Sequence, residues 1–435
     1  MTPGTCGGGL RGMVSTRPFE PGSVVARVPH SSVLEVTSLP TSPPAGLTSR
    51  AAYLAAPWWA RLALLLLREK RLGSASACAP YIASLPAHPL PTPQHWSDGA
   101  LARLRDAELV ARCRDAKREI AAQHAALCAS PDLPPGSAAA TFTASEFGWA
   151  VDMVRSRTFS GPYEGSDWID RVQQTALIGI LTAVYLLTAA GPVDNALSGA
   201  LAGLGFVFLK DLAIQALPNA PRRYIMVPLL DMCNHQPGVV SDLTYQYFGN
   251  AFELCIGTGA SSAGQEVCIS YGQHSAEELL QMYGFVYTAG DNVDDVVTLS
   301  AADVDAAPAG AQLTPQLAAA LKAASPLVLP RSGSVLPPDL DASLAAASGG
   351  QRTHRAALSQ LVAAKYPPQQ AERDEADLRA LQARAAMLGQ RSAGASASDD
   401  VEEAAELLAA QFRVAKAATA RAVCAALAGP SGTKQ

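Results

Sequence analysis

The sequence predicts an α+β protein in which two β-rich stretches flank a helical insert and a helical region follows. Strand signals occur before about residue 47, disappear over about 48–221, and return between about 222 and 290. The strand candidates at the two ends of this unit have to pair with each other, because only then are their apolar faces buried and their edges covered. Hydrophobic residues make up 49% and charged residues 16% of the 435 residues, a composition typical of a globular protein.

The strand candidates are short runs of β-branched residues bounded by turn signals. A Pro-Gly pair separates the first two runs, and the later runs have the same character. The predicted strands are residues 12–15, 24–28, 224–227, 252–256 and 266–271.

The helical insert is predicted from apolar residues at helical spacing. Residues 58–72 place Trp58 and Leu62 on one face and end in a run of charged side chains. Further helices are predicted over 98–127 and 147–157, with a break rich in Pro, Gly and Ala between them.

We expect two domains, residues 1–299 and an all-α domain over 300–435, because the composition changes between them. Residues 326–350 are rich in Pro, Gly and Ser and predict a loop. Apolar residues at helical spacing then return. The predicted helices cover 378–388 and 408–427, on either side of a low-complexity linker at 392–400.

The segment Val172–Leu209 is unusually apolar and leaves two alternatives open. Residues 172–193 contain no charged side chain and are long enough to cross a bilayer, for which about 20 apolar residues suffice. Gly199 and Gly203 have the small-residue spacing of paired membrane helices. Much of the apolar content is Ala, Gly and Thr, so we expect packed core helices and do not favour membrane contact.

Charge and cysteine content exclude several classes of protein. A formal net charge of −5 provides no extended basic surface, so we expect no nucleic-acid partner. The eight cysteines include no Cys-x-x-Cys pair and are too sparse for a disulfide scaffold, so we predict a reducing compartment and no metal site. No signal or transit peptide is visible. We expect a monomer.

Several familiar active-site motifs are absent or out of context. Residues 7–12 match the dinucleotide pattern Gly-x-Gly-x-x-Gly, but six residues precede them and a strand follows. Pyrophosphate binding needs a strand before the glycines and a helix N-terminus after them, so this is not a Rossmann turn. The sequence has no Gly-x-Ser-x-Gly elbow, Walker loop or His-Glu-x-x-His, which leaves hydrolase and metalloprotease interpretations without support.

Three segments far apart in the sequence belong together. They are GLRGMVS at 9–15, VPLLDMCNH at 227–235, and GQEVCISYG at 264–272 with YGFV at 283–286, supported by YIASLP at 81–86 and SRTF at 156–159. In this order they resemble the SET-domain methyltransferases, specifically the branch typified by the Rubisco large-subunit lysine methyltransferase. The resemblance covers roughly residues 8–290. It implies a split SET β-fold, S-adenosyl-L-methionine as cofactor and a protein substrate held with the help of the helical C-terminal domain.

The resemblance also implies roles for single residues. The Asn-His pair would hold the cofactor largely through backbone groups, and the glycines would let the backbone approach it. The implied cofactor-binding residues are Gly9, Leu10, Arg11, Gly12, Arg157, Asn234, His235, Tyr271 and Phe285. The implied substrate-binding residues are Arg157, Asp231, Tyr271 and Tyr283, with Tyr271 also the catalytic residue.

Methyl transfer from a sulfonium to an amine requires a neutral amine. Roughly one lysine in a few thousand is neutral at pH 7. A narrow aromatic channel and the nearby sulfonium charge both lower the pKa of the amine, so no dedicated base is required. The Tyr271 hydroxyl would align the amine with the methyl group, and catalysis would be mostly positioning and electrostatics.

We therefore expect protein-lysine N-methylation of a non-histone substrate. Protein-histidine methylation stays open, as does a catalytically silent SET fold that binds proteins and contacts membrane through its apolar segment. Gly161 lies where the plant enzyme has a second substrate-contacting arginine, which argues against Rubisco as the target. The spacing from Arg157 to Val227 is long, and no cysteine cluster of the post-SET zinc type follows residue 286. Plant and algal relatives suggest the chloroplast, with the cytoplasm as the alternative.

Overall fold

The computed structural model describes residues 1–6, 11–129, 133–161, 168–188, 198–203, 205, 222–246, 250–257, 262–287, 290–331, 336–388 and 397–428. The chain divides into two compact units. Unit 1 comprises Met1–His88 and Ile120–Ser270, and unit 2 comprises Pro89–Glu119 and Tyr271–Gln435. This division by contacts differs from the predicted boundary at residue 299, which follows the sequence motifs and stays a prediction.

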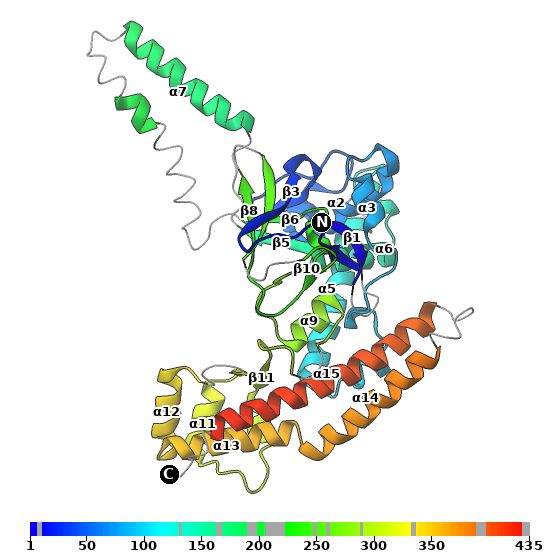
Figure 1. Cartoon of the computed structure of the whole chain (residues 1–435), viewed down its shortest axis with the longest axis vertical. Coiled ribbons are helices and arrows are strands. Elements are labelled where there is room, and N and C mark those ends of the chain that lie inside the picture. Colours follow the sequence, from blue (N-terminus) through cyan, green and yellow to red (C-terminus); the bar gives the residue numbers. More distant parts are fainter. Residues whose placement is uncertain are drawn as a thin grey trace. The chain divides into compact units, whose positions relative to one another are not determined.

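The described residues of unit 1 form three small β-sheets (Figure 1). The first has the order β1 (Thr2–Thr5), β2 (Arg11–Val14), β10 (Glu266–Ile269) and β7 (Asn234–His235). The second has the order β3 (Ser23–Pro29), β9 (Ala251–Ile256) and β8 (Ser241–Gln246), and the third β4 (Leu34–Thr37), β6 (Arg223–Met226) and β5 (Thr158–Gly161). Each sheet pairs a strand from the first β-rich stretch with one from the second, as the burial of their apolar faces requires.

In unit 1, α2 (Trp58–Leu72) packs against neighbouring helices, and its predicted bounds are confirmed. Its leucines Leu62, Leu64, Leu66 and Leu67 are buried, and α6 (Ala144–Arg157) and β4 pack against the helix. A capping box at Thr143 begins α6 and supplies partners for N–H groups that the helix itself leaves free. The remaining helices of the described part of unit 1 include α1 (Arg50–Ala55), α3 (Ala79–Ser84) and α7 (Trp168–Thr188).

The expectation of packed core helices in the apolar segment is wrong for the described face of α7. Ile180, Val184 and Leu187 are exposed, Leu187 to 86%. A contact with the following residues does exist, since Ile178 lies 3.7 Å from where a Cβ on Gly203 would be. Among the helices of the described residues, none combines the length and apolar character that a membrane crossing needs.

Unit 2 is mostly helical. Its helices include α4 (Asp98–Ala102), α9 (Ala276–Tyr283), α10 (Ala301–Asp305), α11 (Pro315–Ala323), α12 (Pro338–Ser348), α13 (Gln351–Lys365), α14 (Pro368–Leu388) and α15 (Ala397–Ala428). The last two pack side by side (Figure 1). The predicted helix over 98–127 is wrong: α4 and α5 (Ala107–Cys128) are separate, because Arg105 has φ 55° and Asp106 Oδ1 accepts from Leu109 N to start the second helix.

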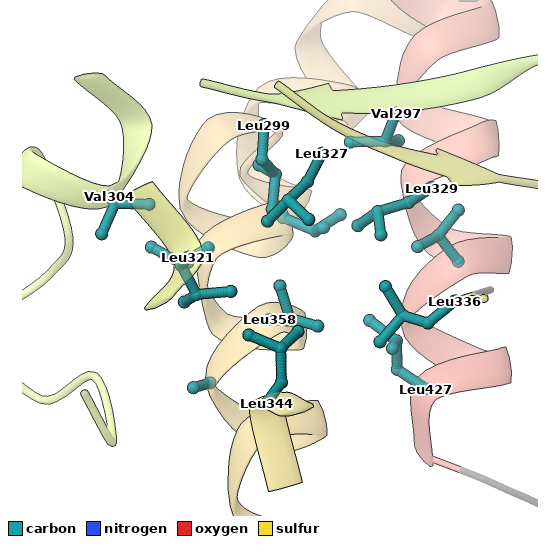
Figure 2. Close-up of a cluster of buried hydrophobic side chains, with 14 of the residues drawn as sticks. Val297, Leu299, Val304, Leu321, Leu327, Leu329, Leu336, Leu344, Leu358 and Leu427 are labelled. Atoms are coloured by element: carbon teal, nitrogen blue, oxygen red, sulfur yellow. The ribbon is translucent and has the colours of Figure 1, made fainter. Parts of the chain in front are cut away.

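The all-α prediction for residues 300–435 needs one correction. β11 (Val296–Leu299) pairs antiparallel with β12 (Leu327–Pro330), and α12 lies in the same predicted loop over 326–350. Leu327 and Leu329 point into an apolar core that Leu358 and Leu427 also line (Figure 2), whereas Val328 between them is 53% exposed. Burial of alternate side chains stabilises this short strand despite its turn-rich surroundings.

Candidate functional site

The first sheet of unit 1 brings the three motif segments together. β10 pairs antiparallel with β2, with Val267 opposite Met13, and parallel with β7, with Cys268 opposite Asn234 and Ile269 opposite His235. Parallel neighbours need a long crossover between them, so this pairing depends on the fold of the whole unit. Strands from the three predicted segments, residues 11–14, 234–235 and 266–269, thus lie in one sheet, whereas residues 271–272 and 283–286 of the third segment belong to unit 2.

Asn234 fastens these strands to one another. Its Nδ2 donates to Arg11 O at 3.1 Å and to Glu266 Oε1 at 2.7 Å. A Cβ on Gly12 would lie 2.7 Å from Asn234 Nδ2 and 2.9 Å from Glu266 Oε1, so no other residue fits there without a shift. The space beside the Gly12 Cα is thus filled by side chains of the chain itself, and cofactor contact at Gly12 stays a prediction.

His235 lies in the same strand and is buried. Its Nδ1 is 3.4 Å from Ile269 O, and the next backbone N–H, of Gln236, donates to the same carbonyl at 3.0 Å. The imidazole thus packs against β10, and its position is fixed by the parallel pairing.

A strained turn precedes the Asn-His pair. Leu229 has φ 71°, a conformation that a leucine adopts only when its surroundings impose it. It begins the short 3-10 helix Leu230–Met232, in which Asp231 N donates to Val227 O at 3.1 Å. This turn directs the Asp231 side chain into the interior, where it is 5% exposed.

Asp231 contacts two residues from distant helices. The Tyr81 hydroxyl, on α3, donates to Asp231 Oδ2, and Arg157 Nη1, at the end of α6, donates to Asp231 O at 2.9 Å. Burial raises the pKa of the Asp231 carboxyl to about 6, although Arg157 and the Tyr81 hydrogen bond act in the opposite direction. The structure therefore joins two predicted substrate-binding residues, Arg157 and Asp231.

Residues 81–86 connect elements around this site through hydrogen bonds. Arg11 Nη1 donates to Ser84 O at 3.0 Å, and the Trp149 indole donates to Pro86 O at 2.8 Å. The segment therefore ties the glycine-containing strand to α6. Tyr81 itself was not among the predicted site residues, although its motif was recognised; a tyrosine is usually a core residue, and its partner lies 150 positions away.

Unit 2 holds an aromatic cluster on and beside α9. The Tyr271 and Tyr283 rings are stacked with centroids 4.7 Å apart, and Phe285 lies 6.1 Å from Tyr283. His274 packs against Tyr283 at 5.8 Å, and Tyr287 meets Phe285 edge to face. All three aromatic residues predicted from this segment are thus neighbours, and His274 and Tyr287 are additions that the motifs did not identify.

Local hydrogen bonds fix this cluster. Ser275 and Glu278 form a capping box at the start of α9, and Glu278 Oε2 is also 3.4 Å from His274 Nδ1. The hydrogen bond to Glu278 raises the pKa of His274. Burial raises the pKa of Tyr283 to about 12, with Glu278 adding to the shift, so its hydroxyl is protonated at neutral pH.

The predicted site residues therefore fall into three groups. Arg11, Gly12, Arg157, Asp231, Asn234 and His235 lie together in unit 1; Tyr271, Tyr283 and Phe285 lie together in unit 2; and Gly9 and Leu10 lie outside the described residues. A shared pocket for Tyr271 and the Asn-His pair stays a prediction. Within the described part of the chain, no group of His, Cys, Asp or Glu side chains is arranged to hold a metal ion.

The chain is similar to known proteins in sequence over a short stretch and in structure over most of its length. No family model matches the chain. Human N-lysine methyltransferase SETD6 is 34% identical over 82 residues, which cover 19% of this chain and 16% of that protein. The SET domain of LSMT bound to lysine and AdoHcy, and Rubisco LSMT bound to AdoMet, each match with a TM-score of 0.50, at 15% and 14% identity, over 98% of this chain and 86% of theirs. With its motif segments paired in one sheet, the chain has the fold of the SET-domain protein methyltransferases.

Proposed function

We propose that this chain is an S-adenosyl-L-methionine-dependent protein-lysine N-methyltransferase that acts on a non-histone protein. The observation that carries the proposal is the pairing of β2, β10 and β7, because it joins the three segments that resemble SET motifs. The fold neighbours add support, since LSMT is solved with AdoMet, and with lysine and AdoHcy.

Residues of unit 1 have the chemistry to hold the cofactor. Arg157 Nε is buried and has no hydrogen-bond partner among the residues that the structure describes, so it fits a ligand carboxylate. The Asn234 amide nitrogen already has two acceptors in the chain, and the His235 ring packs against Ile269 O. These two residues are therefore left to contact the cofactor mainly through backbone groups. When bound, the cofactor supplies a methyl group on a positively charged sulfur.

The aromatic cluster of unit 2 suits the amine acceptor. The stacked rings of Tyr271 and Tyr283 have faces that attract an ammonium group. They offer few hydrogen bonds in place of the water that the ammonium group loses there. Desolvation there lowers the pKa of an inserted lysine and increases its neutral fraction. Both hydroxyls can accept a hydrogen bond from the amine. These bonds would orient the amine lone pair for methyl transfer.

Mass spectrometry of a cell extract incubated with the chain and labelled cofactor tests the proposal. Label on a lysine of a protein is the expected result, and it should fall sharply with a Tyr271→Phe chain as the matched control. Label on histidine would establish the histidine alternative instead. If no protein is labelled and calorimetry detects no cofactor binding, the silent binding module replaces the enzyme.

A further inference from the structure

Tyr81, Asp231 and Arg157 form a buried polar cluster built from three separate elements. Tyr81 comes from α3, Arg157 from the last residue of α6, and Asp231 from the 3-10 helix after the strained turn at Leu229. Tyr81 is 6% and Asp231 5% exposed. Tyr81 is the member of this cluster to which neither the motifs nor the proposed function assigns a role.

The hydrogen bonds of the cluster are unevenly distributed. Tyr81 donates to Oδ2 of Asp231, and Arg157 Nη1 donates to the backbone carbonyl of the same residue. In contrast, Asp231 Oδ1 and Arg157 Nε are buried without a partner in the part of the chain described. Buried polar atoms are nearly always hydrogen-bonded, so the unpaired acceptor on Asp231 indicates that a ligand donor completes the cluster.

We propose that Tyr81 is a positioning residue that holds Asp231 as an oriented carboxylate, leaving Asp231 Oδ1 to accept a hydrogen bond from the substrate. The complementary ligand group is an N–H donor, such as a peptide amide or an amino group. The inference rests on the proposed function, because Asp231 acts here in substrate binding.

The surroundings of Asp231 explain why it needs such a partner. The titratable groups that face the cluster are Tyr81, Arg157, the neighbouring Cys233 and, beside Tyr81, Cys78. Burial raises the pKa of Asp231 to about 6, and both Arg157 and the Tyr81 hydrogen bond oppose that rise. Burial also raises the pKa of Tyr81 well above its usual value, so Tyr81 remains a donor throughout the working pH range. Without its hydroxyl, the carboxylate is less stable and Asp231 takes up a proton at higher pH.

The pH dependence of kcat/KM separates this role from a structural one. We expect an acidic limb near pH 6 in the natural chain, shifted upward by at least 0.5 pH unit in Tyr81→Phe and absent in Asp231→Asn. The Tyr81→Phe loss should be at least about 1.5-fold at pH 6.5, should grow at lower pH, should appear mainly in KM for the protein substrate, and should largely disappear at pH 9. Tyr53→Phe, which removes a hydroxyl from another buried tyrosine of unit 1, should leave the limb in place.

A loss in Tyr81→Phe that is equal at every pH would overturn the inference and make Tyr81 a packing residue. Carbon-13 NMR of carboxyl-labelled aspartate supplies a measurement that needs no activity, with the Asp231 signal assigned by its loss in Asp231→Asn. If that signal titrates at the same pH with and without the Tyr81 hydroxyl, the inference is again wrong. If it shifts upward while no methyl transfer occurs on any substrate, the proposed function fails and the role of Tyr81 in setting Asp231 stands.

Discussion

Two buried aspartates, Asp231 in unit 1 and Asp295 in unit 2, occupy similar depths and differ in how completely they are hydrogen-bonded. Asp295 is 1% exposed, and its oxygens accept from the N–H groups of Ala276 and Val296, from Thr419 Oγ1 and from Lys416 Nζ. Asp231 accepts from Tyr81 through Oδ2, while its Oδ1 has no partner among the described residues.

The number of hydrogen-bond donors distinguishes Asp295, whose charge has a structural role, from Asp231, whose Oδ1 is available to a ligand. Asp295 joins β11, α9 and α15, so its full set of donors stabilises unit 2 by itself. An acceptor buried without a donor destabilises the fold by about 1–3 kcal/mol, and such a group persists where function needs it. Buried carboxylates are therefore informative through their missing hydrogen bonds rather than through burial alone.

The largest expected effect is on the saturated cluster. Lys416→Met should destabilise unit 2 by about 3–5 kcal/mol, because it leaves Asp295 and Glu277 as uncompensated buried charges. Urea unfolding monitored by circular dichroism measures the change. Lys322→Ala, which breaks an exposed ion pair with Asp305, is the control and should lose at most about 1 kcal/mol. Equal effects for the two variants would show that the Asp295 cluster is not a structural centre.

The second prediction concerns the pH dependence of stability at Asp231. Its pKa in the folded chain, about 6, lies above the ordinary value near 4, so its contribution to stability is complete below pH 4 and is lost as pH rises through 6. Asp231→Asn removes this loss. The free energy of unfolding of the variant, relative to that of the natural chain, should therefore increase by on the order of 2–3 kcal/mol between pH 4 and pH 7. Parallel urea titration curves at four pH values test this; a constant difference contradicts it.

A third prediction turns to the aromatic cluster. Tyr271→Phe should keep cofactor binding in calorimetry and lower turnover at least tenfold, which corresponds to about 1.4 kcal/mol of transition-state stabilisation. The phenyl ring preserves the stacking on Tyr283 and removes only the hydroxyl. Tyr287→Phe, the same change at the edge of the cluster, should have a much smaller effect. Unchanged turnover in Tyr271→Phe would remove this hydroxyl from the mechanism.

The smallest effect should come from the cap of α6, the helix that carries Arg157. Thr143→Ala removes the side chain that accepts from Glu146 N and should lower the free energy of unfolding by about 1 kcal/mol. Because Arg157 lies at the opposite end of the helix, kcat/KM should stay within a factor of two. Thr143→Ser retains the cap and should restore stability; a large loss of activity in Thr143→Ala would mean that the cap positions Arg157.

Sequence periodicity predicted much of unit 1, because the elements concerned depend on residues that are close together in the sequence. Alternating and β-branched runs identified β3, β6, β9 and β10, and helical spacing identified α2 to the residue. The same approach missed β12, whose two inward leucines lie within a stretch of turn-forming residues. It also joined α4 to α5, since nothing in their periodicity indicates the left-handed conformation of Arg105.

The sequence by itself determined α2, several strands of unit 1, the motif residues and hence the family that the chain resembles. Only the tertiary structure decided the parallel register that sets Asn234 beside Cys268, the filling of the space at Gly12, and the contact of Tyr81 with Asp231. The reason is physical. Periodicity depends on residues a few positions apart, whereas the pairing of a buried polar atom depends on which distant side chains the completed fold brings within hydrogen-bonding reach.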